Sequence, residues 1–331
     1  MKALSKYIKT LILAVILCST AGISAQSMEE AKKTFNKGLE AFKAQDILAA
    51  VESFNQVIEI CAVVYEEEED EEAEQLMYQC MEKVPALYLR LAQTSFKAKD
   101  LEKGFEYAAE AKKTSKEYED DETYKKTLNL LGQVYYMMGS RKLKAKDFDG
   151  AIVEYDKGIA ENPEYAKLYY YKAFAYKSKG DDANVKATSL KAIEVAEKKR
   201  NREIIGKTKK LAYTYFLKKG NDAKTAKDLD AAESALKDAF EFKDNDAMGL
   251  SLMASVYLDK KAYDDAIAYS EKALAVETDV TKKSNYNFTI AEAYKAKGDN
   301  ASACAAYKKV TTGSYAENAA YQLEHGNLGC E

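Results

Sequence analysis

Proline, glycine, histidine and tryptophan are all scarce in this chain. Its 331 residues include 2 Pro, 15 Gly, 1 His and no Trp. The shortage of Pro and Gly excludes collagen-like and low-complexity classes, and it argues against an all-β fold, which needs many turn residues. A formal net charge of −4 gives no electrostatic reason to bind nucleic acid. Ala, Lys, Glu, Leu and Tyr dominate instead, so the composition predicts a helical protein.

A catalytic or metal site is hard to assemble from these residues. His325, the single imidazole, falls in the predicted last turn of a helix, where a cation interacts favourably with the helix dipole. A Ser/His/Asp or Cys/His arrangement would need another base. The sequence has no phosphate-binding Gly motif and no helical metal-ligand motif. We therefore expect a non-catalytic protein without cofactor or metal.

The first 25 residues are typical of an export signal. Three lysines precede a short apolar stretch at 11–17, and small residues follow up to Ala25. Leu17 ahead of Cys18 does not suit lipid attachment, so we expect cleavage after Ala25. No later run of about 18 apolar residues is present, which predicts no transmembrane segment. The expected location is outside the cytoplasm: the periplasm, or an outer-membrane-associated or extracellular setting.

Four cysteines remain after such a cleavage: Cys61, Cys80, Cys304 and Cys330. An even number in an exported protein predicts two disulfides, for which three pairings exist. We expect the local pairs, Cys61 with Cys80 and Cys304 with Cys330. Four buried free thiols are the alternative, and the spacings are too wide for the usual zinc ligands.

Seven segments share one residue pattern. A small residue is followed three or four positions later by an aromatic residue in most copies, then by a polar patch, and an Ala, Gly or Val comes 12 positions after the first small residue. Small residues at two facing positions let antiparallel helices approach closely, and the polar patch is the turn between them. Each copy therefore predicts a helical hairpin that must stack on its neighbours to bury its apolar face. The leading small residues are Gly38, Ala92, Gly139, Ala173, Gly220, Ala254 and Ala291.

The pattern resembles the tetratricopeptide repeat over roughly residues 30 to 320. The most typical copy begins Asp147-Phe148-Asp149-Gly150-Ala151-Ile152, and a 34-residue step recurs from Gly139 to Ala173 and from Gly220 to Ala254. The family's Trp is missing, and Pro ends a repeat only at Pro163. The resemblance implies an all-α, right-handed solenoid of about seven helical hairpins with a C-terminal capping helix. Two first helices are expected to be long, at 124–146 and 203–228.

The expected organisation is a signal peptide at 1–25 and a solenoid at 26–331. The repeats fall at roughly 31–64, 85–118, 132–165, 166–199, 213–246, 247–280 and 284–313, with an acidic insert at 61–80 and the capping helix at 315–325. The insert carries the run Glu66 to Glu72, which we interpret as a solvated loop or helix start. Contact with a basic partner and calcium binding are the alternatives.

In this family the first helices line a concave groove in which peptides lie. By resemblance, groove positions come three residues before each leading small residue, one after it, and four or five after it. The partner-binding residues predicted in this way are Phe42, Phe96, Tyr136, Tyr170, Phe174 and Lys177. Aromatic side chains with a nearby lysine suit an extended peptide with apolar side chains. The alternative for each aromatic residue is packing between helices.

The predicted function is a non-catalytic scaffold or adaptor of the periplasm or cell envelope that binds a protein or peptide partner in the groove. One alternative is a chaperone-like holdase, or an accessory factor for envelope assembly, secretion or surface-polymer handling. Another is glycan stacking on the cluster Tyr169-Tyr170-Tyr171. Neither a nucleic acid nor a small molecule is the expected partner.

Overall fold

The computed structural model describes residues 28–330, and within them the regular secondary structure is helical, without strands. The signal peptide and its cleavage after Ala25 lie outside the described residues. Two compact units divide the chain, Met1–Tyr165 and Ala166–Glu331, and each is described by itself.

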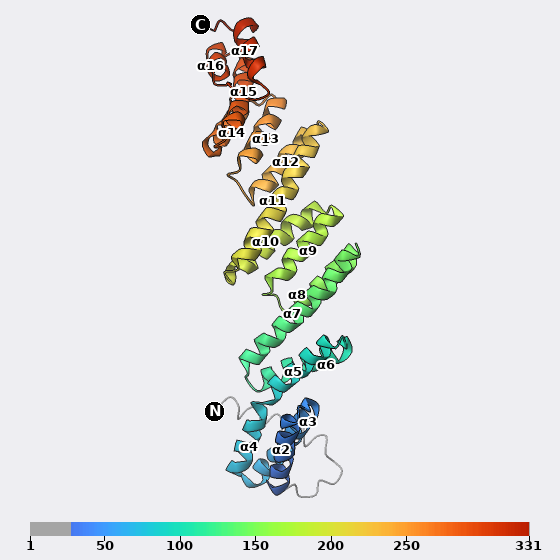
Figure 1. The fold of residues 1–331 in the computed structure, drawn as a ribbon. Helices are drawn as coiled ribbons and strands as arrows, with labels where there is room; N and C mark the ends of the chain where they lie inside the picture. Colours follow the sequence, from blue (N-terminus) through green and yellow to red (C-terminus); the bar gives the residue numbers. More distant parts are fainter. Residues whose placement is uncertain (1–27, 331) are drawn as a thin grey trace. The chain divides into compact units, whose positions relative to one another are not determined.

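Successive helices pair into hairpins in both units (Figure 1). The described part of the first unit contains α2 (Met28–Lys43), α3 (Ile47–Glu68), α4 (Glu71–Met81), α5 (Val84–Lys97), α6 (Leu101–Glu117), α7 (Asp121–Lys144) and α8 (Phe148–Glu161). The second contains α9 (Ala166–Lys179), α10 (Asp182–Lys198), α11 (Arg202–Thr225), α12 (Leu229–Phe240), α13 (Ala247–Asp259), α14 (Tyr263–Val276), α15 (Val280–Lys297), α16 (Asn300–Tyr307) and α17 (Ala316–His325).

Seven hairpins are formed by the described residues, which confirms the predicted all-α hairpin array. The pairs are α2/α3, α5/α6 and α7/α8 in the first unit, and α9/α10, α11/α12, α13/α14 and α15/α16 in the second. The two first helices expected to be long are α7 and α11, each of 24 residues. Two helices stand outside the pairs: α4, between the first two hairpins, and α17, after the last.

The turn inside each hairpin has one recurring structure. A residue with positive φ follows the first helix within two residues, and the next residue caps the second helix. The positive-φ residues are Gln45, Lys99, Lys146, Gly180, Lys227, Lys261 and Gly298. In six hairpins the capping residue is Asp, whose carboxylate accepts a hydrogen bond from a backbone N–H three residues on. The exception is Ala262, which has no side-chain cap. The polar patch of the sequence pattern is this turn.

The leading small residues mark where the two helices of a hairpin touch. A Cβ added at Gly139 would lie 2.4 Å from the ring of Tyr155, which is fully buried. A Cβ at Gly220 would lie 2.7 Å from Leu236, which is also fully buried. The side chain from the second helix thus fills the space that a larger residue on the first would need, and close packing leaves no alternative place for it.

The acidic run belongs mostly to helices. Glu66, Glu67 and Glu68 end α3, Glu69 adopts a left-handed conformation, and Asp70 caps α4 by accepting hydrogen bonds from two backbone N–H groups. The first turn of α4 then holds three glutamates, a favourable place for carboxylates because the helix dipole is positive there. The acidic residues therefore start α4 rather than forming a long loop.

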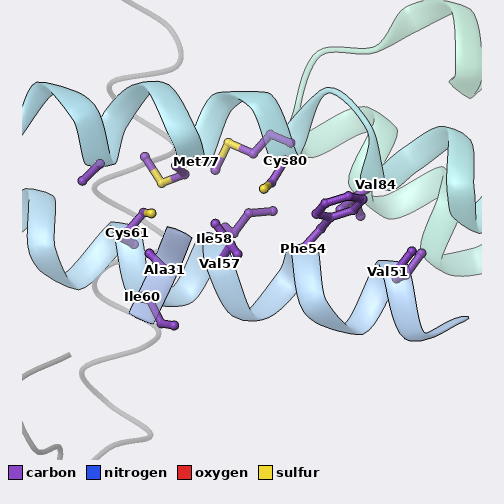
Figure 2. Close-up of a cluster of buried hydrophobic side chains, with 14 of the residues drawn as sticks. Ala31, Val51, Phe54, Val57, Ile58, Ile60, Cys61, Met77, Cys80 and Val84 are labelled. Carbon is purple, nitrogen blue, oxygen red and sulfur yellow. The ribbon is translucent and has the colours of Figure 1, made fainter. Parts of the chain in front are cut away.

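The first unit buries an apolar cluster that centres on α3 and α4 and includes residues of α2 and α5 (Figure 2). Phe54, Met77 and Val84 lie in this cluster and are at most 1% exposed. Long apolar α3 is also the one described helix whose length and composition would allow it to cross a membrane. Most of its apolar window is buried inside the unit, and a core helix satisfies the same criteria. We describe it as a core helix.

The expected pairing of Cys61 with Cys80 is not formed. Both cysteines are free thiols, fully buried in the α3/α4 cluster, whereas Cys304 and Cys330 form a disulfide. Figure 2 shows Cys61 facing the part of α4 that carries Met77, with Cys80 further along α4 toward Phe54. Because Met77 and Cys80 are three residues apart, the two thiols are offset by nearly one helical turn. The register of the helix pair thus separates them.

Candidate peptide-binding groove

An open groove lies between two neighbouring first helices of the second unit, α11 and α13. It has a cavity volume of about 470 Å³. Its lining comes equally from both helices: Thr214, Leu217, Lys218 and Asn221 from α11, and Met248, Ser251, Leu252 and Ser255 from α13. Counted from the leading small residues Gly220 and Ala254, both sets occupy the same four offsets: six, three and two residues before, and one after.

The groove combines apolar walls with hydroxyl groups that already have partners. Leu217, Leu252 and Met248 supply the apolar surface, and Met248 is 61% exposed. The Thr214 hydroxyl donates to the backbone carbonyl of Lys210 at 2.8 Å, and that of Ser251 donates to Met248 at 3.0 Å. Side chains with internal partners leave a surface whose free chemistry is mainly apolar, which suits an apolar side chain of a peptide.

A part-buried hydrogen bond joins α11 to the start of α13. The Tyr213 hydroxyl of α11 donates to Asp246 Oδ2 at 2.6 Å, and Asp246 is also the N-cap of α13, accepting from the Gly249 N–H at 3.3 Å. Burial, together with the hydrogen bond to Asp246, raises the pKa of the Tyr213 hydroxyl, so it stays protonated and donates. Gly249 leaves room for this contact, because a Cβ there would lie 2.7 Å from the Tyr213 oxygen. The two walls of the groove are therefore held at a fixed spacing.

The predicted residues of the first unit differ in exposure. Phe42, in the last turn of α2, is 39% exposed. Phe96 packs edge to face on Phe105 with centroids 5.1 Å apart, and its ring lies against Gly104 of the facing helix. Tyr136 on α7 is half-buried. Phe96 therefore packs inside its hairpin, in line with the alternative given for each aromatic residue.

The predicted residues of the second unit all lie on α9. Tyr170 is half-buried and packs edge to face on Tyr171, with centroids 4.9 Å apart. Phe174 is 37% exposed, and the Lys177 ammonium lies 5.7 Å from the centroid of its ring. The structure thus brings Phe174 and Lys177 together in a cation–π contact.

The offsets separate the six predicted residues into two groups. Tyr136 and Tyr170 lie three residues before their small residue, and Phe174 lies one after, which are offsets that line the α11/α13 groove. The other three predicted residues, Phe42, Phe96 and Lys177, lie four residues after, an offset absent from that groove. The sequence analysis did not name Met248, Leu252 or Asn221. The residues at the offset of six before each small residue, Thr214 and Met248, share no residue type, so the sequence carries no signal for this position.

Residues that could hold a metal are not grouped in the described part of the chain. Between residues 28 and 330, no three His, Cys, Asp or Glu side chains are placed together as metal ligands. His325 lies in the last turn of α17, exposed, with its ring 5.0 Å from that of Tyr321. Its surroundings are those of a helix C-terminus.

Successive helical hairpins with an open groove between two of their first helices define a helical-repeat protein. The tetratricopeptide repeat model matches residues 250–279 and 284–312, the last two hairpins of the chain. These two hairpins match the tetratricopeptide repeat, and the same turn and small-residue contacts recur in the other hairpins of the described chain. No curated protein matches it.

Solved structures of similar fold are themselves tetratricopeptide proteins. One is from Parabacteroides merdae, 15% identical, covering 89% of this chain and 97% of that one, with a TM-score of 0.28. YrrB, described as having an unusual peptide-binding site, is 16% identical over 54% of this chain and 84% of that one, with a TM-score of 0.30. The TPR2AB domain of yeast Sti1, in a complex with pHSP90, is 17% identical over 91% and 98%, with a TM-score of 0.29.

Proposed function

We propose that this protein is a non-catalytic scaffold of the periplasm or cell envelope that binds an extended peptide segment of a protein partner. The α11/α13 groove carries the proposal, because exposed Met248 of α13 and apolar Leu217 of α11 both line it. The surface continues on α9, where Tyr170 and Phe174 occupy groove offsets. An apolar side chain of the partner would fill the space between Leu217, Met248 and Leu252.

The extracytoplasmic setting belongs to the same proposal. It is supported by the export-signal pattern at 1–25 and by the Cys304–Cys330 disulfide, because disulfides persist in oxidising compartments. The intact mass of the protein isolated from its native cells tests it. Loss of 25 residues is the expected result, and a full-length mass would contradict the export signal.

The groove is tested by a cross-linked pulldown from native cells with the wild type and two matched variants. Met248→Glu places a carboxylate in the groove, and Leu190→Glu places one on an exposed site of α10, a second helix. We expect Met248→Glu to lose one stoichiometric partner by roughly tenfold or more, because a buried apolar anchor contributes about 1.5–3 kcal/mol. Leu190→Glu should retain it.

Equal recovery of the partner with both variants would place the binding surface elsewhere. Capture of many unrelated clients by the wild type would replace the adaptor with the holdase alternative. Phe174→Glu extends the test to α9, where we expect a smaller loss because Lys177 already covers one part of that ring.

A further inference from the structure

The chain after α16 turns back over the first helix of the last hairpin. Residues 311–330, here called the C-terminal arm, comprise the segment at 311–315, α17, and the tail at 326–330. The Thr312 N–H donates to Ser284 Oγ of α15 at 3.1 Å. The Tyr315 ring stacks on Phe288 with centroids 4.4 Å apart and an interplanar angle of 13°. Lys295 then donates to Gln322 Oε1 of α17 at 2.6 Å.

The surface beneath the arm corresponds to the α11/α13 groove. Asn285 and Phe288 of α15 lie six and three residues before the small residue Ala291. On α11 these offsets are Thr214 and Leu217, and on α13 they are Met248 and Ser251, all of which line the open groove. On α15 the same offsets contact the arm. The last hairpin therefore has a peptide segment of its own chain on its binding face.

The arm approaches α15 as closely as backbone allows, at Gly313. Its φ is +84°, and an added Cβ would lie 2.9 Å from Thr281 Cγ2 and 3.2 Å from Asn285 Oδ1. Only glycine adopts this positive φ without strain and also leaves the space that a Cβ would take. Asn285 Oδ1 is buried and has no hydrogen-bond partner, so the covered surface still has one unused acceptor.

Little apolar burial holds the arm in place. Tyr315 is 42% exposed, and α17 buries a single residue, Ala319. The tail adds Leu328, and Cys330 ties the arm to Cys304 of α16. The backbone joins the start of the arm to α16, and the disulfide holds its far end, so both ends of the arm are tethered and the arm has a high effective concentration at its surface.

We propose that residues 311–315 are a built-in ligand that occupies the binding face of the last hairpin, and that the Cys304–Cys330 disulfide keeps it there. The surface fits a peptide with a glycine two residues before an aromatic side chain, which stacks on Phe288. A dithiol reductant opens it: the dithiol donates two electrons and two protons, the Cys304–Cys330 bond becomes two thiols, and the dithiol becomes a disulfide. The inference rests on the proposed function only in taking this face as the peptide-binding one.

Hydrogen exchange of the full mature chain tests the tether without any partner. With dithiothreitol, amides of residues 311–330 should exchange about tenfold faster or more, while those of α13 and α14 keep their rates and show that the fold is intact. The Cys330→Ser variant should show the fast rates without reductant. Cys61 and Cys80 are already thiols, so the reductant has no second disulfide to act on between residues 28 and 330. Unchanged exchange of the arm in both experiments would overturn the role of the disulfide.

A peptide of sequence VTTGSYAE, copied from residues 310–317, tests the ligand. By fluorescence anisotropy it should bind Tyr315→Ala/Cys330→Ser at least about tenfold more tightly than the oxidised wild type. The same peptide with alanine for tyrosine should bind neither. Equal binding to both proteins, or to none, would overturn the built-in ligand. Neither readout depends on Met248, so failure here is distinguishable from failure of the α11/α13 groove.

Discussion

The additional helices at the two ends of the described chain, α4 and α17, are held on their neighbouring hairpins in different ways. Both α2–α4 and α15–α17 consist of a hairpin followed by an additional helix, and each end has two cysteines, counting Cys330 in the tail after α17. Helix α4 buries Ala73, Met77, Cys80 and Met81 among its 11 residues, whereas α17 buries one of its 10. The α4 end keeps its cysteines as thiols, and the α17 end joins them. A helix with enough apolar surface needs no covalent tether, and one without it does.

The largest expected difference between the ends concerns burial. Met77→Ala removes a fully buried side chain and should lower the free energy of unfolding by about 2–5 kcal/mol. Tyr321→Ala, at a position on α17 that is 60% exposed, should change it by less than about 0.5 kcal/mol. Urea unfolding followed by circular dichroism measures both. Similar losses in the two variants would remove the distinction between a buried helix and a tethered one.

The next difference appears at high pH. Burial raises the pKa of the Cys61 thiol to about 11, with the Asp70 charge adding to it, and raises that of Cys80 to about 12. Unfolded thiols ionise near pH 9.0, so the unfolded state gains from deprotonation first. The stability contribution of both thiols is therefore complete below pH 9 and decreases as pH rises toward 11, by about 1.4 kcal/mol per pH unit for each thiol.

The disulfide at the other end does not titrate, so it adds no such slope. The measurement compares urea unfolding of the wild type and Cys61→Ala/Cys80→Ala between pH 8 and 11, which subtracts the titration of Lys and Tyr residues. A wild type and double variant with parallel pH profiles would contradict the assignment to these thiols.

The smallest expected difference lies in equivalent turns. The positive-φ position is Gln45 in the first hairpin, with φ 65°, and Gly298 in the last, with φ 81°. Gln45→Gly should stabilise the protein, and Gly298→Ala should destabilise it, each by about 1 kcal/mol, because a Cβ is unfavourable in the left-handed region. Thermal unfolding of both variants measures the two shifts. Shifts of the same sign would show that the turns are not equivalent.

Features that depend on one hairpin could be predicted from the sequence. The leading small residues and the polar turn are set within one helix pair, and Gly139 with Tyr155 or Gly220 with Leu236 shows why they recur. The state of Cys61 and Cys80 could not be predicted, because it depends on the register of α3 against α4. The groove beside Met248 forms only where two hairpins stack, and Phe288 is covered only because of the path that the arm takes. The repeat pattern of the sequence encodes neither of these arrangements.

The recurring turn has a consequence for how such a chain changes in length. Each hairpin contains its own left-handed residue, and all but one contain their own capping Asp, so the start of every second helix is specified locally. A duplicated hairpin would carry its own positive-φ residue and capping residue. It would further require only small residues where it packs on its neighbours. Insertion of whole hairpins within either unit should therefore be compatible with the fold. A hairpin added after α16 would have to displace the C-terminal arm, because the arm covers α15 of the last hairpin.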